Sequence, residues 1–129
     1  MNQIKLLRIA FILGAVTDAF ALLPMIFPKL ANIFWGFSDF SGAYQYAMGY
    51  GASLMLGWTV FLIWAAQKPI ERKYAAILTM IVILGFVITE IFSVLSGFIS
   101  IEHVIISWIM QALLFALYSW VYFYPKDQQ

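Results

Sequence analysis

Two acidic residues lie inside long apolar segments, where a charged side chain is costly. Asp18 lies within the apolar segment 9–27, and Glu90 lies within the apolar segment 74–96. An ionisable group at the centre of a bilayer costs at least about 2.5 kcal/mol to insert, so it normally points toward other helices and marks a functional site. No Lys or Arg lies at a matching depth, so each acid needs a proton, a hydrogen-bond partner or water. Asp18 and Glu90 are therefore the first candidate site residues.

Polar side chains recur at helical spacing in two other apolar segments. One stripe contains His103, Ser107, Gln111 and Tyr118, and a second contains Tyr46, Tyr50, Ser53 and Gly57. At a rise of about 1.5 Å per residue, most of these polar groups and both acids lie within about 5–14 Å of the same membrane surface. The spacing predicts a polar pocket that opens to that surface and is centred on Asp18, Glu90 and Gln111. We expect Glu102, His103 and the first outer loop to cover it.

The residue types of this pocket favour binding over catalysis. An acid in an apolar pocket is a counter-ion for a cation, and the rings of Tyr46, Tyr50 and Trp58 would form aromatic walls around it. Glu90 and His103 would make an acid–base pair, but nothing in the sequence fixes their distance, so an enzyme is not indicated. With one histidine and no cysteine, the chain lacks the usual donors for haem or zinc, and we expect no metal or cofactor.

Three functions stay open on this evidence. The first is binding of a small amphipathic or cationic molecule, or of a lipid headgroup, with Asp18 as the counter-ion. The second is proton-coupled transport of a small molecule, with Asp18 as the proton carrier. The third is an accessory subunit of a larger membrane complex, in which Asp18 and Gln111 only make hydrogen bonds between helices.

The composition explains why these residues must be positioned by helices in a membrane. The chain has 129 residues, of which 64% are hydrophobic and 10% are charged. Soluble domains are about 45–50% apolar and about 25% charged. A small soluble domain buries only about two-thirds of its surface, too little to hide so much apolar area. Seven Lys and Arg against six Asp and Glu leave no basic face for nucleic acid.

Four segments are long enough to span a bilayer, which takes about 20 apolar residues. The predicted spans are 9–27, 44–66, 74–96 and 104–123. Short connections make sequential neighbours antiparallel, so we predict an all-α, single-domain, four-helix bundle. We expect Pro24 and Pro28 to end the first helix, and Leu30, Ile33, Phe34 and Phe37 to form a short helix in the interface.

The basic residues predict the orientation, because cytoplasmic loops carry an excess of Lys and Arg. One side of the predicted bundle holds six of them and the other holds Lys29; the six are Lys5, Arg8, Lys68, Arg72, Lys73 and Lys126. We therefore expect a multi-pass protein of the cytoplasmic membrane with both termini inside the cell. The alternative is a cleaved signal peptide ending near Ala19-Phe20-Ala21, which Asp18 disfavours.

Small residues in the second predicted span repeat every four positions. Gly49, Ser53 and Gly57 form one such row, and Ala43, Ala47 and Gly51 form another. Rows of this kind let two helices approach closely in lipid. The partner helix lies either in the same chain or in a second copy, so a homodimer through Gly49, Ser53 and Gly57 is one reading.

Four short motifs carry a resemblance to known families. A group of small prokaryotic four-span membrane proteins with no assigned activity resembles this chain in three of them, which are Gly-Ala-Ser-Leu-Met-Leu-Gly-Trp at 51–58, Lys-Pro-Ile-Glu-Arg at 68–72 and Asp-Ala-Phe-Ala-Leu-Leu-Pro at 18–24. The stretch Leu-Leu-Arg-Ile-Ala at 6–10 is similar to the opening of DoxX-like proteins. These likenesses imply the four-span fold and the membrane location, and no activity.

Overall fold

The computed structural model describes residues 2–125, and every element in that range is helical. The helices are α1 (Gln3–Ile26), α2 (Pro28–Trp35), α3 (Gly42–Gln67), α4 (Tyr74–Leu95) and α5 (Ile101–Phe123). All except α2 are long and apolar enough to cross a membrane, as the four predicted spans require. The predicted all-α four-helix bundle is therefore confirmed, and the chain is a multi-pass membrane protein.

The first helix is longer than its apolar segment predicts. It begins at Gln3, six positions before Ile9, because the side chain of Asn2 accepts a hydrogen bond from the Lys5 amide at 3.1 Å and caps the helix. At the other end the helix continues through Pro24 to Ile26, so Pro24 does not end it. The break comes at Phe27, which is extended because the residue before a proline disfavours helical geometry.

The expected short helix after the first span is present as α2 and contains Leu30, Ile33 and Phe34, but Phe37 lies beyond its end. It begins at Pro28, a residue suited to the first turn of a helix, and ends at Gly36, which has a left-handed φ of 71°. Its Ala31 is fully buried, whereas Ile33 and Phe34 are exposed. The exposed apolar side chains are those expected of a helix that lies against the membrane interface.

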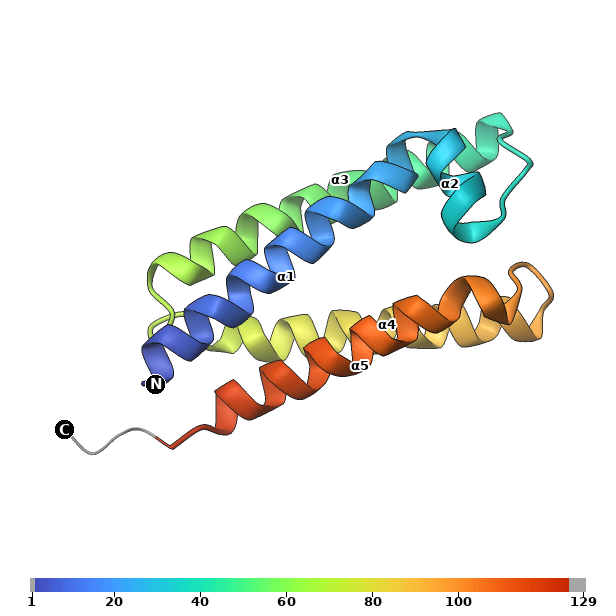
Figure 1. Cartoon of the computed structure of the whole chain (residues 1–129). Helices are drawn as coiled ribbons and strands as arrows, with labels where there is room; N and C mark the ends of the chain where they lie inside the picture. The colour runs from blue at the N-terminus through green and yellow to red at the C-terminus, as the bar shows by residue number, and fades with distance from the viewer. Residues whose placement is uncertain (1, 126–129) are drawn as a thin grey trace.

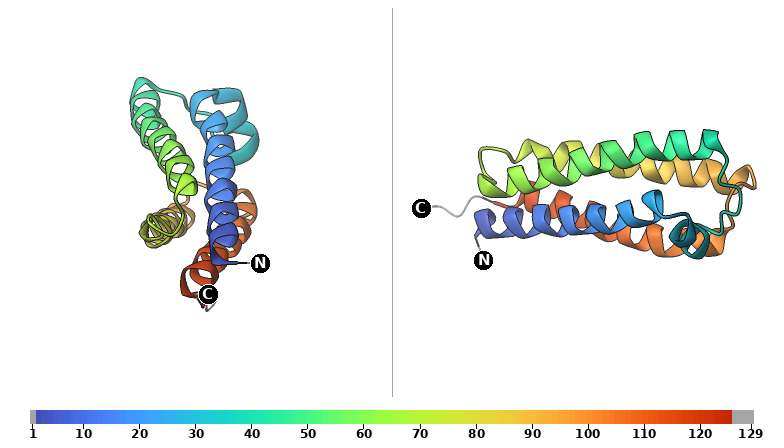
Figure 2. Two further views of the ribbon diagram at one scale, coloured as in Figure 1. Left: turned by 90° about the vertical axis from the view of Figure 1, so that its left-hand side faces the viewer. Right: turned by 90° about the horizontal axis from the view of Figure 1, so that it is seen from above.

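The four spans form two antiparallel pairs, α1 with α3 and α4 with α5 (Figure 1). Helix α1 also packs against α5 and so joins the pairs, which Figure 2 shows along the bundle and from above. The start of α1, the end of α5 and the loop 68–73 lie at one end, called here the terminal end (Figure 1). Helix α2 and the loop 96–100 lie at the opposite end, called here the α2 end. The two pairs lie closest at the terminal end and diverge toward the α2 end (Figure 1).

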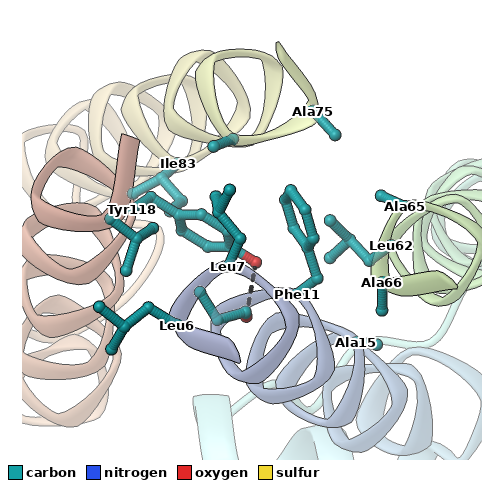
Figure 3. Packing of buried hydrophobic residues seen from close by; sticks show 13 residues of the cluster. Leu6, Leu7, Phe11, Ala15, Leu62, Ala65, Ala66, Ala75, Ile83 and Tyr118 are labelled. Carbon is teal, nitrogen blue, oxygen red and sulfur yellow. Dashed lines mark hydrogen bonds between the residues drawn. The ribbon is translucent and has the colours of Figure 1, made fainter. Parts of the chain in front are cut away.

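The terminal end of the bundle, where the two helical pairs lie closest, holds most of the apolar core (Figure 3). Phe11 and Tyr118 are fully buried there, with ring centroids 6.1 Å apart. The Tyr118 hydroxyl donates a hydrogen bond of 3.0 Å to the Ala10 carbonyl, drawn as a dashed line in Figure 3. Gly14 allows this approach, because a Cβ there would overlap the Tyr118 hydroxyl. The core thus holds α1 against α3 and α5 at the terminal end, before the two helical pairs diverge.

The serine and threonine hydroxyl groups inside the spans fall into two classes. On α1, α3 and α4 they bond to the carbonyl four residues earlier on their own helix; these are Thr17, Ser53, Thr59, Thr79, Thr89 and Ser93. On α5, Ser107 and Ser119 instead reach across to Glu90 and Met80 of α4. Helix α5 is therefore held to α4 by polar contacts that cross between the helices.

The small residues of α3 are used unequally within the chain. Gly51 faces α1, where a Cβ would lie 2.6 Å from the methyl carbon of Met25. A Cβ at Gly49 or Gly57 would meet nothing within 4 Å, and Ser53 between them is exposed. The row of Gly49, Ser53 and Gly57 therefore lies outside the contacts that hold this chain together.

The basic residues collect at one end of the bundle. The terminal end carries Lys5, Arg8, Lys68, Arg72 and Lys73, whereas Lys29 lies on α2 at the opposite end. Lys126 lies outside the described residues. This distribution agrees with the alternation of spans from which the orientation was predicted.

Candidate functional site

Three of the predicted site residues form one hydrogen-bonded chain between α4 and α5. The Ser107 hydroxyl donates to Glu90 Oε1 at 2.6 Å, and Gln111 Nε2 donates to the Ser107 hydroxyl at 3.0 Å. Ser107 and Gln111 are four residues apart on one helix and so share a face. The antiparallel α4 brings Glu90 to the same level. The structure thus joins Glu90, Ser107 and Gln111, as the helical spacing predicts.

This hydrogen-bonded chain leaves two acceptors without a donor. Glu90 Oε2 and Gln111 Oε1 are both buried and find no hydrogen-bond partner within residues 2–125. Gln111 as a whole is only 9% exposed. A buried acceptor with no partner costs about 1–3 kcal/mol, and the cost is greater for a charged group. The site therefore favours any bound group that donates hydrogen bonds or carries positive charge.

A groove between α4 and α5 is lined by one member of this chain, Gln111, whereas Glu90 and Ser107 are not part of its lining. It has a volume of about 350 Å³ and is lined by Trp108 and Gln111 together with apolar side chains, which are Ile83, Leu84, Val87, Ala112, Phe115 and Ala116. The Trp108 Nε1 group is buried and has no acceptor within residues 2–125. The groove thus combines an apolar lining with unpaired polar atoms, which is the usual character of a small-molecule site.

Trp108 was missed by the sequence reasoning, although a signal for it exists. It precedes Gln111 by three positions, and residues three apart lie on adjoining parts of a helix surface. The signal is its N–H group, a hydrogen-bond donor on a large apolar ring system three positions before Gln111. The pattern of polar side chains does not include a tryptophan, although its N–H is polar.

Asp18 lies apart from this chain of hydrogen bonds. It is half-buried and finds no hydrogen-bond or ion-pair partner within residues 2–125. It follows Gly14 by one turn, and Gly14 contacts Tyr118 and Leu62, the last layer of the core before the pairs diverge. Asp18 is absent from the lining of the α4–α5 groove. Its place is therefore at the point where the core ends.

The predicted aromatic walls do not form one cluster. The Tyr46 and Tyr50 rings contact each other at a tilt of 51°, with centroids 5.0 Å apart, but the two residues are 69% and 62% exposed. Their neighbour Ser53 bonds to the Gly49 carbonyl on the same helix. Trp58 packs against Phe61 and the apolar core, two helical turns beyond Tyr50. These residues lie on α3, and none of them lines the α4–α5 groove.

His103 lies at the junction between α5 and α2. Its Nδ1 is hydrogen-bonded to the Ser100 hydroxyl, and the Glu102 carboxylate lies 3.9 Å away. A Cβ at Gly36 would lie 3.0 Å from the His103 ring, so the ring packs against the end of α2. The histidine therefore lies at the α2 end, in the region that was expected to cover the pocket.

Within residues 2–125, no group of three His, Asp or Glu side chains lies close enough together to hold a metal ion. Comparison of the chain with protein-family models, curated proteins and solved structures found no match in any of the three.

Proposed function

We propose that this multi-pass membrane protein binds a small amphipathic molecule whose polar group is a cation or a hydrogen-bond donor. The observation that carries the proposal is the pair of buried acceptors without donors, Glu90 Oε2 and Gln111 Oε1. Gln111 lines the apolar α4–α5 groove, and Glu90 is joined to it through Ser107. An ammonium group would supply donors to both acceptors, and its charge would balance that of Glu90. Its apolar part would lie in the α4–α5 groove.

In this proposal Asp18 is a second acidic group for the same class of ligand. A mid-span acid without a partner attracts a cation because the surrounding hydrocarbon screens charge weakly.

The protein would lie in the cytoplasmic membrane with its terminal end inside the cell. Five basic residues of the terminal end, against Lys29 at the α2 end, support this orientation. The ligand would then enter from the outer side.

Native mass spectrometry of the protein released from mild detergent tests the proposal. Dodecylammonium, a lipophilic cation whose N–H groups can donate to both acceptors, is added to the wild type and to the variants Glu90→Gln, Asp18→Asn and Glu71→Gln. Glu71 is an exposed acid of the loop 68–73 at the terminal end, so its substitution makes the same charge change away from the groove. We expect Glu90→Gln to weaken binding about tenfold or more, as loss of a buried charge pair does.

The result for Asp18→Asn distinguishes the roles of the two acids. Weaker binding in both Asp18→Asn and Glu90→Gln, with Glu71→Gln like the wild type, supports a shared cation site. Equal binding by wild type and Glu90→Gln would overturn the proposal. Equal losses in all three variants would also overturn it, because a general effect of charge would then explain the binding.

A second function, proton-coupled transport, is favoured by Asp18 itself. A half-buried acid without a partner in the middle of a span is the kind of group that carries protons in transporters. Proteoliposomes with an imposed pH gradient would then take up tetraphenylphosphonium faster than protein-free liposomes, and Asp18→Asn would remove this excess uptake. Binding without any excess uptake removes this candidate and leaves the binding function in place.

A third function, an accessory subunit or a homodimer, is favoured by the exposed row of Gly49, Ser53 and Gly57. This row is suited to close helix contact, yet no helix of the chain covers Gly49 or Gly57. The same mass spectra report bound partners. A stoichiometric second chain that is lost in Gly49→Leu would support association through this face, and a monomer in both proteins would exclude it.

A further inference from the structure

A second groove runs along the other helical pair, between α1 and α3. Its volume is about 470 Å³, and most of its lining is apolar; the lining residues are Arg8, Ile12, Ala15, Val16, Ala19, Thr59, Ile63, Ala66 and Gln67. The residues from α1 recur every three or four positions and so form one face of that helix. Arg8 and Gln67 lie toward the terminal end, and the apolar residues extend from them toward the middle of the bundle.

The length of this groove matches half of a bilayer. Arg8 and Ala19 are eleven positions apart on α1, which corresponds to about 16 Å at the rise of a helix. The hydrocarbon core of a membrane is about 30 Å thick, so each leaflet contributes roughly half of that. The whole groove, from Arg8 to Ala19, therefore has about the length of one leaflet at the terminal end.

Arg8 is held at the mouth of the groove. Its Nε donates a hydrogen bond of 3.2 Å to the Ala66 carbonyl at the end of α3, which fixes the guanidinium between the two helices. The terminal guanidinium nitrogens make no hydrogen bond within residues 2–125. Lys5, three residues earlier, is exposed on an adjoining part of α1. The mouth thus offers hydrogen-bond donors and positive charge for an anion.

Within residues 2–125, the other charges of the terminal end leave this positive charge uncompensated. Glu71 is the acidic residue of the 68–73 loop, and it pairs with Lys68 at 3.1 Å. Arg72 donates to the Trp64 carbonyl and lies over the Trp64 ring. Lys73 precedes the first residue of α4, and its Nζ lies 5.1 Å from the centre of the Tyr122 ring. No acidic residue of the described part of the chain lines the α1–α3 groove.

We propose that the α1–α3 groove is a binding site for an anionic phospholipid, with the phosphate on Arg8 and an acyl chain along Ile12, Val16 and Ile63. The charge at the mouth, the apolar lining and the one-leaflet length all fit this occupant. The site lies on the opposite pair of helices from the α4–α5 groove. It goes beyond the proposed function and does not depend on it.

Competition between two lipids tests this site. The protein is placed in nanodiscs that contain equal amounts of palmitoyl-oleoyl phosphatidylglycerol and palmitoyl-oleoyl phosphatidylcholine, then released for native mass spectrometry. The two lipids share their acyl chains and differ in net charge. We expect retained phosphatidylglycerol to exceed phosphatidylcholine about fivefold or more, the factor that one basic residue at an anionic surface supplies.

Two variants and one matched control locate the site. Arg8→Gln should reduce the preference to about equal retention, whereas Lys73→Gln removes the same charge next to the other helical pair and should preserve it. Ala19→Phe fills the deep part of the groove from an exposed position and should reduce retention of both lipids. It also keeps the test decisive if Arg8→Gln folds poorly, because it leaves the Arg8–Ala66 hydrogen bond in place.

The outcomes that would overturn the proposal are distinct. Equal retention of the two lipids by the wild type would show that charge does not select the occupant. Equal effects of Arg8→Gln and Lys73→Gln would show that the whole basic end attracts lipid without a site. Full retention in Ala19→Phe would show that the groove is not where the acyl chain lies.

Discussion

Gly14 sets how closely α5 approaches α1. Its missing side chain leaves room for the Tyr118 hydroxyl, which bonds to the carbonyl of Ala10 one turn earlier. Leu62 of α3 closes the same position from the other side. A single absent methyl group therefore lets three helices meet, and the buried Tyr118 hydroxyl obtains its partner from the α1 backbone.

Gly14→Ala should destabilise the protein by about 1–3 kcal/mol, because the new methyl overpacks the core. Tyr118→Phe should cost about 1 kcal/mol through the lost hydrogen bond. In the double variant the hydroxyl that the methyl overlaps is gone, so the two costs should be less than additive by about 0.5 kcal/mol or more. The measurement is the unfolding free energy in detergent micelles.

Gly57→Ala is the control for this cycle. A Cβ at Gly57 meets nothing within 4 Å, so the change should be neutral or should stabilise the helix by up to about 1 kcal/mol. If Gly14→Ala behaved like Gly57→Ala, the close packing of Tyr118 on α1 would be refuted.

The sequence predicts part of the residue-scale geometry. The four-residue spacing of Ser107 and Gln111 predicts that they share a helix face and marks them as candidate partners for a buried acid. It does not predict which acid they meet, and in the structure Ser107 bonds to Glu90. Tyr118 belongs to the same stripe in the sequence, yet it lies in the apolar core because its partner is a backbone carbonyl of α1. Backbone partners leave no mark in a pattern of side chains.

At the scale of elements, α2 is attached through a glycine and a histidine. Gly36 ends the helix with a positive φ, and the His103 ring of α5 packs against it. Ala31 is buried on the same helix. The end of α2 is therefore fixed to α5, although the chain between α2 and α5 passes through two full spans.

Gly36→Ala should loosen α2. A residue with a side chain pays about 1–2 kcal/mol in the left-handed region, and the new Cβ would also press on the His103 ring. Hydrogen exchange of the amides in 28–35 should accelerate. The measurement is exchange followed by mass spectrometry in detergent.

Gly97→Ala separates the two causes, because Gly97 has a similar φ of 73° but open space around its Cβ position. Gly97→Ala should lower the free energy of unfolding about as much as Gly36→Ala does, while hydrogen exchange in α2 stays at the wild-type rate. His103→Ala, which removes the ring without backbone strain, should also accelerate exchange in α2. Wild-type exchange in His103→Ala would contradict the attachment of α2 to α5.

Hydropathy predicts the spans well and their ends less well. The apolar segment starting at Ile9 marks where the chain enters hydrocarbon, but α1 extends back to Gln3 because Asn2 caps it. Helix length follows hydrogen bonding, whereas the apolar run follows lipid contact. The pairing of α1 with α3, in preference to other neighbours, depends on close contacts such as Gly51 with Met25, which no single segment reveals.

At the scale of the whole molecule, the alternation of the spans makes a topology experiment decisive. The chain contains no cysteine, so single cysteines can be introduced without background. Ser38→Cys lies in the loop between α2 and α3, and Glu71→Cys lies in the loop at the terminal end; both positions are exposed. A membrane-impermeant maleimide should label position 38 in intact cells and position 71 only after permeabilisation.

The cysteine-free wild type serves as the blank for this labelling. The opposite labelling pattern would contradict the proposed orientation and leave the fold intact. Labelling of both positions from one side would contradict the arrangement of spans itself, because these two loops lie at opposite ends of the bundle (Figure 1).

The divergence of the two helical pairs has a consequence for the lipids around the protein. The terminal end is narrow because the core draws the spans together there, and the opposite end is widened by the splayed pairs and by α2 (Figure 1). Such a tapered body displaces more lipid molecules from one leaflet than from the other. Each copy inserted thus creates an imbalance of area between the leaflets, which a flat bilayer relieves by bending toward the narrow end.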